Sequence, residues 1–153
     1  MTAMHLLHQV QVIPVSREDL WDFISTPLNL NRITPPEMSF EILGEAPART
    51  YAGQLIEYRV KIPLLGRTRW ISEITELDEG VSFVDEQRKG PYKSWVHLHL
   101  LEEVEGGVKM TDEVRYLMPF GPFGQLARLL FVKRALARIF QYRRHRIDEI
   151  FPR

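Results

Sequence analysis

Apolar and polar residues alternate along most of this chain, which is the two-residue period of β-strands. The alternation predicts a first strand at His5–Ile13 and further strands at 38–43, 53–62, 67–77, 81–88, 93–103 and 108–118. The connections between the later strands are short and rich in glycine or proline, as in β-hairpins. We therefore predict an antiparallel meander in which successive strands pair.

The remaining segments have the period of a helix. After the first strand, Ser16 and Asp19 form a capping box for one short helix, and Pro27 opens a second that ends at Pro35. A long helix is predicted over 122–151, with apolar residues at steps of three and four: Leu129, Val132, Leu136, Ile139, Phe140, Ile147 and Ile150. This helix is the element large enough to cover the apolar face of a sheet.

Composition narrows the class of protein. The chain has 153 residues, 44% of them hydrophobic, so we expect one domain over 1–153 with a real core. Twenty basic and twenty acidic side chains cancel, and no nucleic-acid partner is expected. The absence of cysteine excludes disulfides, thiolate catalysis and cysteine-based zinc sites. With no signal-peptide pattern and no long apolar run, we expect a cytoplasmic protein.

The order strand, two helices, six strands, long helix resembles the START/Bet v 1 superfamily, also called SRPBCC or helix-grip proteins. Within it, 83–92, 95–99 and 110–116, with Pro119, are similar to bacterial ligand-binding SRPBCC or polyketide cyclase/dehydrase-like proteins. The resemblance implies an α+β fold. A strongly curved antiparallel sheet of about seven strands would wrap around the long C-terminal helix, with two short helices after the first strand. It also implies a hydrophobic cavity between sheet and helix, more firmly than any reaction.

Strand parity predicts which side chains face that cavity. In the strand predicted at 93–103, two alternating sets of side chains are possible inner faces. Either the set that includes His97 and His99 points inward, or the aliphatic set that includes Leu98 does. We favour the histidines inside, because they then meet Asp85 and Asp112 of neighbouring strands. The candidate ligand-binding residues are Tyr58, Trp70, Phe83, Asp85, Gln87, Trp95, His97, His99, Asp112, Tyr116, Leu129 and Leu136.

His97 and Asp112 are the candidate catalytic pair, since a carboxylate can orient an imidazole and shift its pKa. The interpretation we favour is a hydrogen-bonded polar cluster that fixes strand register, because no nucleophile or cofactor motif accompanies the pair. His97 and His99 with Asp85 or Asp112 also have the spacing of a two-histidine, one-carboxylate metal site. That motif has low specificity, so we expect neither a metal nor a cofactor.

Three connections at one end of the predicted meander carry large apolar residues, although turns are normally polar. These residues are Leu64, Leu65, Tyr92, Phe120 and Phe123. They form either the mouth of the pocket, able to admit a lipophilic ligand or touch a membrane or partner, or a seal on the start of the last helix.

The last helix is rich in basic residues, among them Arg128, Lys133, Arg134, Arg138, Arg143, Arg144 and Arg146. We interpret them as a solvated outer face, with contact to anionic lipid as the second interpretation.

Taken together, these patterns favour a non-catalytic protein that binds or carries a lipophilic small molecule such as a lipid, quinone or polyketide. The first alternative is a cofactor-independent cyclase, dehydratase or hydratase, in which His97 and Asp112 move protons and Tyr116 or Gln87 orients a carbonyl. The second is a membrane- or partner-associated regulatory protein that uses the apolar loop end.

Overall fold

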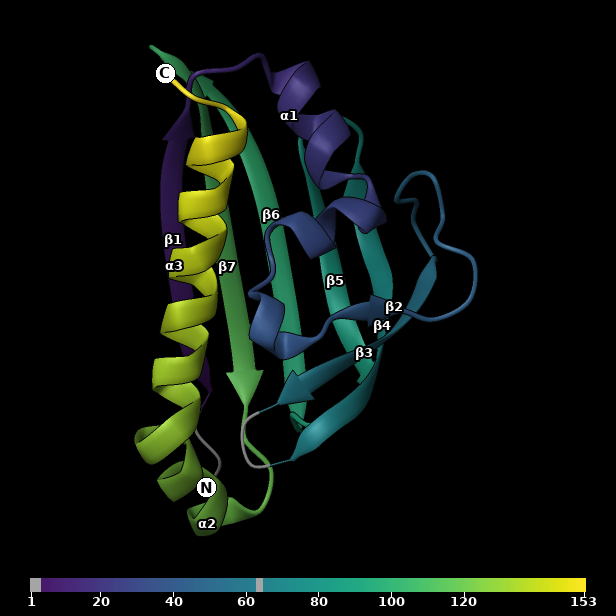
Figure 1. The fold of residues 1–153 in the computed structure, drawn as a ribbon, viewed down its shortest axis with the longest axis vertical. Helices are drawn as coiled ribbons and strands as arrows, with labels where there is room; N and C mark the ends of the chain where they lie inside the picture. The colour runs from purple at the N-terminus through teal and green to yellow at the C-terminus, as the bar shows by residue number, and fades with distance from the viewer. Residues whose placement is uncertain (1–3, 63–64) are drawn as a thin grey trace.

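The computed structural model describes residues 4–62 and 65–153. Within them, seven strands form one antiparallel sheet in the order β1-β7-β6-β5-β4-β3-β2 (Figure 1). The strands are β1 (His5–Ile13), β2 (Glu41–Ile42), β3 (Leu55–Ile62), β4 (Gly66–Asp78), β5 (Ser82–Lys89), β6 (Ser94–Val104) and β7 (Gly107–Leu117). The predicted meander is confirmed from β2 to β7, and β1 closes the order by pairing with β7.

Six helical elements occur in the described part of the chain, and those between the first two strands, together with the last one, lie on the concave face of the sheet (Figure 1). The six elements are α1 (Arg17–Ile24), the 3-10 turns η1 (Pro27–Arg32) and η2 (Pro36–Met38), α2 (Gly121–Ala127), the π-helical segment η3 (Arg128–Val132) and α3 (Lys133–Ile150). The Ser16 hydroxyl accepts from the amide of Asp19, as the sequence predicts for the start of α1. None of the helices in the described part of the chain is long and apolar enough to cross a bilayer.

Two elements of the structure differ in detail from those that the sequence predicts. The second short helix is a pair of 3-10 turns, and the strand predicted at 38–43 is reduced to Glu41–Ile42. The reason is local: η2 runs to Met38, and Ser39 then adopts a left-handed conformation with φ 47°. Extended backbone can therefore begin only after this residue.

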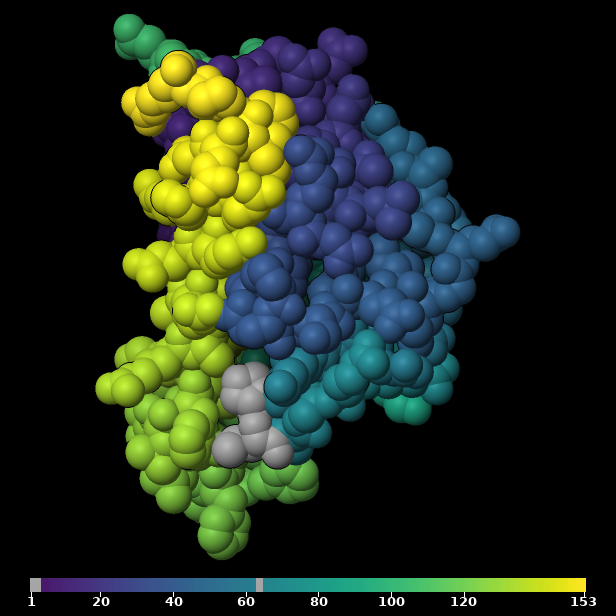
Figure 2. Space-filling view, in the orientation of Figure 1, coloured from purple at the N-terminus to yellow at the C-terminus, as the bar shows by residue number. Residues whose placement is uncertain are grey.

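The sheet grips α3 through polar as well as apolar contacts. In Figure 1, α3 runs along β1 and β7, while α1, η1 and η2 cover the sheet beside it. The Gln9 amide donates to the carbonyl of Phe140, and the Gln11 amide donates to the carbonyl of Arg144 and to Asp148. Figure 2 shows residues of η1 and η2, in dark blue, packed directly against α3.

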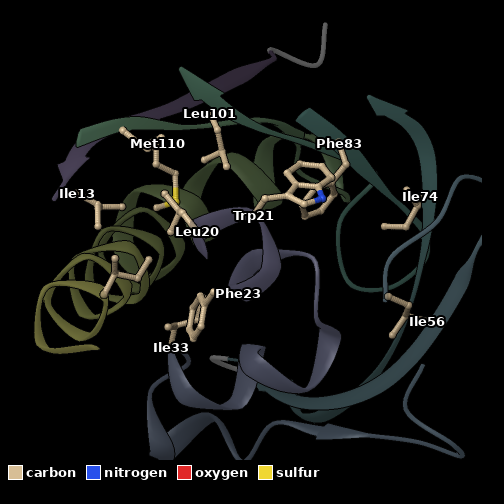
Figure 3. Close-up of a cluster of buried hydrophobic side chains, with 12 residues drawn as sticks. Ile13, Leu20, Trp21, Phe23, Ile33, Ile56, Ile74, Phe83, Leu101 and Met110 are labelled. Atoms are coloured by element: carbon tan, nitrogen blue, oxygen red, sulfur yellow. The ribbon is translucent and has the colours of Figure 1, made fainter. Parts of the chain in front are cut away.

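The largest apolar cluster lies where α1 meets the sheet. Leu20 and Trp21 reach from α1 towards Met110 and Phe83 of the strands (Figure 3). Trp21 and Phe83 meet edge to face at a centroid distance of 5.9 Å, and the indole N–H donates to Glu79. This cluster closes one end of the space between sheet and helices, and aromatic burial of this kind stabilises the closure.

The strand faces follow the predicted parity. Trp95, His97 and Leu101 are buried on the inner face of β6, whereas Leu98 and Leu100 are only half-buried on the outer face. The prediction that the histidines point inward is therefore confirmed.

The predicted apolar stripe of the terminal helix is wrong at Leu129. In a regular helix Leu129 and Leu136 lie two turns apart on one side, yet Leu129 is 62% exposed and Leu136 only 4%. Leu129 itself lies in the π-helical segment Arg128–Val132, whose wider turn changes the angle at which its side chains project relative to those of the helix that follows. Leu129 is thus rotated to the outside, and Arg128 instead donates to the hydroxyl of Tyr116 at 3.0 Å.

Truncation of the two leucines tests this change of face. We expect Leu136→Ala to lower the free energy of unfolding by about 2–5 kcal/mol, because it leaves a cavity in the core. Leu129→Ala, the matched control, should change it by less than about 0.5 kcal/mol. Urea denaturation measures both, and equal losses would contradict the placement of Leu129.

Candidate ligand-binding site

A cavity of about 170 Å³ lies between the inner face of the sheet, η1, η2 and α3. Its wall is mostly aliphatic and aromatic. Ten of the residues that the sequence analysis assigned to the pocket or its mouth are in this wall: Tyr58, Trp70, Phe83, Asp85, Tyr92, Trp95, His97, His99, Asp112 and Leu136. They come from five strands, the β5–β6 connection and α3, so the cavity exists only in the folded chain.

Aromatic side chains form one wall. Tyr58 and Trp70 stack with centroids 5.8 Å apart, and Trp70 meets Trp95 edge to face at 5.3 Å. The Trp70 indole donates to the hydroxyl of Ser72 at 3.0 Å, which satisfies its N–H inside the core. Burial raises the pKa of Tyr58, so this phenol stays neutral at physiological pH.

A polar wall faces the same cavity, built by crossed hydrogen bonds between three strands. Asp85 is paired with His97 in the sheet register, and Asp112 with His99. Each histidine nevertheless bonds the carboxylate opposite the other. His97 Nε2 lies 2.8 Å from Asp112 Oδ1, and His99 Nε2 lies 2.6 Å from Asp85 Oδ2. Since the imidazole rings stack at 3.7 Å, one network links β5, β6 and β7.

Arg143 completes this network from α3, and its predicted place on the solvated outer face is wrong. Its side chain is only 12% exposed, with Nη1 3.4 Å from Asp112 Oδ1 and the guanidinium 4.8 Å from the ring centroid of Phe140. The signal was present in the sequence: Arg143 follows Leu136 by seven residues and precedes Ile147 by four, which places it on the apolar side of the helix.

The charges of the network follow from its contacts. Burial by itself raises the pKa of Asp112, but the hydrogen bond from His97 and the charge of Arg143 outweigh it, so the net pKa is lowered. Burial likewise opposes ionisation of Asp85, whose pKa is nevertheless lowered by the His99 hydrogen bond and neighbouring charges. Burial lowers the pKa of His99. Both carboxylates are thus ionised at neutral pH and accept hydrogen bonds from Nε2 of the imidazoles.

Three predicted ligand-binding residues do not line the cavity. The Gln87 amide is used within the β5–β6 connection, where it donates to the carbonyl of Tyr92 and accepts from its amide. Tyr116 is buried behind Trp95 and Tyr92, with its hydroxyl bound to Arg128. Leu129 is exposed because of the π-helical turn.

The ends of β3, β5 and β7 lie together at the lower edge of Figure 1, and of the predicted mouth residues that the structure describes only Tyr92 turns inward. It packs on Trp70 and Trp95. Leu65, Phe120 and Phe123 are exposed and do not line the cavity, and Leu64 lies outside the described residues. A pocket mouth at this end therefore stays a prediction.

The donor groups of Asp85, His97 and His99 lie within 4.8 Å of one another, so these three side chains could hold a metal ion. The hydrogen bond between His99 and Asp85 already uses two of the donors. Arg143 also places a positive charge beside Asp112. These contacts make a proton-bearing network the better description of the cluster.

Comparison with solved structures supports the same architecture. A Chromobacterium violaceum protein is 14% identical to this chain, with a TM-score of 0.70 over 97% of both chains. A Rhodobacter sphaeroides protein is 15% identical, with a TM-score of 0.69 over 98% of this chain and 97% of the other. Norcoclaurine synthase from Thalictrum flavum, in complex with dopamine and hydroxybenzaldehyde, is 13% identical, with a TM-score of 0.63 over 97% of this chain and 88% of the other.

At identities this low, the comparisons show that the fold is shared and nothing more. The chain therefore has the α+β helix-grip fold of Bet v 1-like proteins, as its sequence predicts. No protein-family model and no curated protein matches the sequence.

The lowered pKa of His99 makes stability depend on pH. The ordinary pKa of a histidine is 6.5. As the pH falls below this value, His99 takes up a proton in the unfolded chain. In the native protein the same imidazole lies among His97, Asp85, Asp112 and Arg143 and resists protonation. Native stability should therefore decrease from pH 6.5 to about 5, a window above the titration of ordinary carboxyl groups. We expect His99→Gln to flatten this slope in urea denaturation.

His8→Gln, at an exposed position of β1, is the control and should leave the slope unchanged. A His99→Gln variant with the slope of the unaltered protein would show that His99 does not titrate differently in the two states.

Proposed function

We propose that this protein binds or carries a lipophilic small molecule, such as a lipid, a quinone or a polyketide fragment, in the cavity between the curved sheet and α3. The observation that carries the proposal is the cavity of about 170 Å³, with its largely apolar and aromatic wall and one polar wall. Ligand sites commonly combine such a lining with a few polar groups. An apolar cavity of roughly 150 Å³ holds benzene, so a ring or a short chain segment fits.

A structural neighbour supports a small-molecule role. The norcoclaurine synthase structure, which shares the fold over almost the whole chain, contains dopamine and hydroxybenzaldehyde. The fold thus accommodates small aromatic compounds in at least one protein. The wall of Tyr58, Trp70 and Trp95 offers aromatic contacts to a ligand in this chain as well.

A cofactor-independent cyclase, dehydratase or hydratase is the alternative, and the buried pair of His97 and Asp112 favours it. With Nε2 donating to Asp112, the Nδ1 atom of His97 is a proton acceptor. We rank this alternative second, because Nδ1 lies 3.8 Å from Asp85 and both histidines serve the network. The His97→Gln variant separates the two: it abolishes turnover by an enzyme, whereas a carrier retains binding.

The cavity can be tested by filling it. Native mass spectrometry of the freshly purified protein should show a co-purified small molecule, and toluene should bind the emptied protein in a calorimetric titration. Val60 is buried in the cavity wall, so Val60→Phe should weaken toluene binding at least about tenfold. Val12→Phe, on an exposed position of β1, is the matched control. An apo mass together with no toluene binding would contradict the proposal.

We also propose that the protein makes peripheral contact with an anionic membrane. Six large apolar side chains are exposed on α2, on the link that joins β7 to α2, and on η3. We call them the apolar ridge: Phe120, Phe123, Leu126, Leu129, Leu130 and Phe131. Two phenylalanines that are 80% and 81% exposed are unusual on a surface in contact only with water.

Charge favours an anionic surface as the occupant of the apolar ridge. No acidic residue occurs between 114 and 147, whereas Lys133 and Arg134 follow the ridge and are exposed. Aromatic and aliphatic side chains beside basic ones are the composition of helices that lie in the interface of anionic bilayers.

Vesicle co-sedimentation tests this contact. We expect binding to phosphatidylcholine vesicles that contain phosphatidylglycerol, weaker binding at high salt, and little binding to phosphatidylcholine alone. The double variant Phe120→Ser, Phe123→Ser should bind at least about tenfold more weakly, because burial of each ring stabilises the bound state.

Leu55→Ser alters a leucine that is 62% exposed on β3 and should not change vesicle binding. Equal losses in both variants would contradict a specific role of the apolar ridge. A dimer in solution that the phenylalanine substitutions dissociate would identify a second copy of the chain as the occupant instead.

A further inference from the structure

The proton-bearing network of the cavity leaves one pair of atoms mismatched. His97 Nε2 donates to Asp112, so in the neutral imidazole the Nδ1 atom carries a lone pair and no proton. This Nδ1 atom has no hydrogen-bond partner among the described residues. It lies 3.8 Å from Oδ2 of Asp85, which is also an acceptor. Two acceptors that face each other repel, and a cation between them replaces this repulsion with attraction.

His99 brings a third donor atom to the same place. Its Nε2 atom lies 2.6 Å from Asp85 Oδ2, and the donor atoms of Asp85, His97 and His99 all lie within 4.8 Å of one another. Two atoms that bind the same zinc ion lie about 3.4 Å apart, because each bond is about 2.1 Å long and the angle between them is tetrahedral. Side-chain shifts of roughly 1 Å therefore bring the three donors to a common ion.

Asp112 is placed to orient both imidazoles toward such an ion. It accepts from Nε2 of His97 at 2.8 Å, and its Oδ1 atom lies 3.6 Å from Nδ1 of His99. A change of tautomer moves the proton of His99 from Nε2 to this Nδ1 atom. Both rings then donate to Asp112 and present their other nitrogen to Asp85. Histidines that bind metals usually donate their second ring N–H to a carboxylate in this way.

Charge and access also favour a cation. The two carboxylates carry two negative charges, and Arg143 supplies one positive charge, which it places 3.4 Å from Asp112 and not on Asp85. With neutral imidazoles, one negative charge is left over. The three donor side chains belong to the cavity wall, and those of Asp85 and His99 are 18% and 12% exposed. The cluster is therefore not sealed from the cavity.

We propose that Asp85, His97 and His99 bind a divalent transition-metal ion such as zinc, with Asp112 as the carboxylate that orients both imidazoles. Imidazole nitrogens suit zinc and its neighbours, whereas magnesium and calcium prefer oxygen ligands. The two histidines alone are a motif of low specificity, and the structure adds both carboxylates to it. The metal site goes beyond the proposed function, because it requires no lipophilic ligand.

Calorimetric titration of zinc into the chelator-treated protein tests the site. We expect one zinc ion per chain and no binding of magnesium. His99→Gln removes a donor and should weaken zinc binding at least about a hundredfold, whereas Asp112→Asn, which alters only the orienting carboxylate, should weaken it about ten- to a hundredfold. Near-ultraviolet circular dichroism of the buried tryptophans establishes that each variant is folded.

His145→Gln is the matched control. His145 is exposed and lies 3.1 Å from Glu149, so this surface pair is the competing site for an ion. The variant should bind zinc as the unaltered protein does. Loss of zinc binding in His145→Gln, with retention in His99→Gln, would assign the ion to the surface and overturn the proposal.

Crystals of the unaltered protein soaked in zinc supply a measurement that needs no variant to fold. We expect an anomalous-scattering peak among Asp85, His97 and His99. Peaks at surface positions only, or a protein that binds no zinc in solution, would show that the metal site is wrong.

The metal site and the proposed function fail separately. Binding of toluene without binding of zinc would support the lipophilic cavity and contradict the metal site. Binding of zinc to the cluster without binding of toluene or a co-purified molecule would support the metal site and contradict the proposed function.

Discussion

One buried carboxylate and one half-buried carboxylate constrain the centre of this molecule. Asp85 and Asp112 lie inside an otherwise apolar space, where an ionised group is stable only with close partners. His97 and His99 of the strand between them supply these partners. A shift of one residue in the pairing of β6 would turn both imidazoles to the outer face. The crossed hydrogen bonds therefore specify strand register and also place polar groups in the cavity.

The terminal helix is bound to the same network of side chains. Arg143 brings the compensating positive charge to Asp112, and Gln9 and Gln11 bind the helix backbone from β1. These contacts hold α3 at the open side of the curved sheet, with space left beside Trp70 and Trp95. The cavity is thus bounded by groups that also stabilise the fold, which explains why polar residues in it need not signal catalysis.

Local sequence patterns predicted the parts of the site that lie on strands. Alternation placed Trp70, Trp95, His97 and His99 on one face, because successive side chains of a strand must point to opposite sides. The same reasoning failed for Gln87, whose parity was right but whose amide is used by the neighbouring turn. Parity specifies the direction of a side chain and not the partner that it finds.

The sequence by itself determined the meander from β2 to β7, the two alternating faces of each strand and the presence of a covering helix, since each depends on periods and turns between near neighbours. Only the tertiary structure decided the position of that helix and its rotation. The π-helical turn before Lys133 separates the face of Leu129 from that of Leu136. The electrostatic attraction of Asp112 holds the side chain of Arg143 towards the inside. The helical period does put Arg143 on the apolar side of the helix, but its partner Asp112 lies 31 residues away in the sequence, and a local period does not record a contact of that kind.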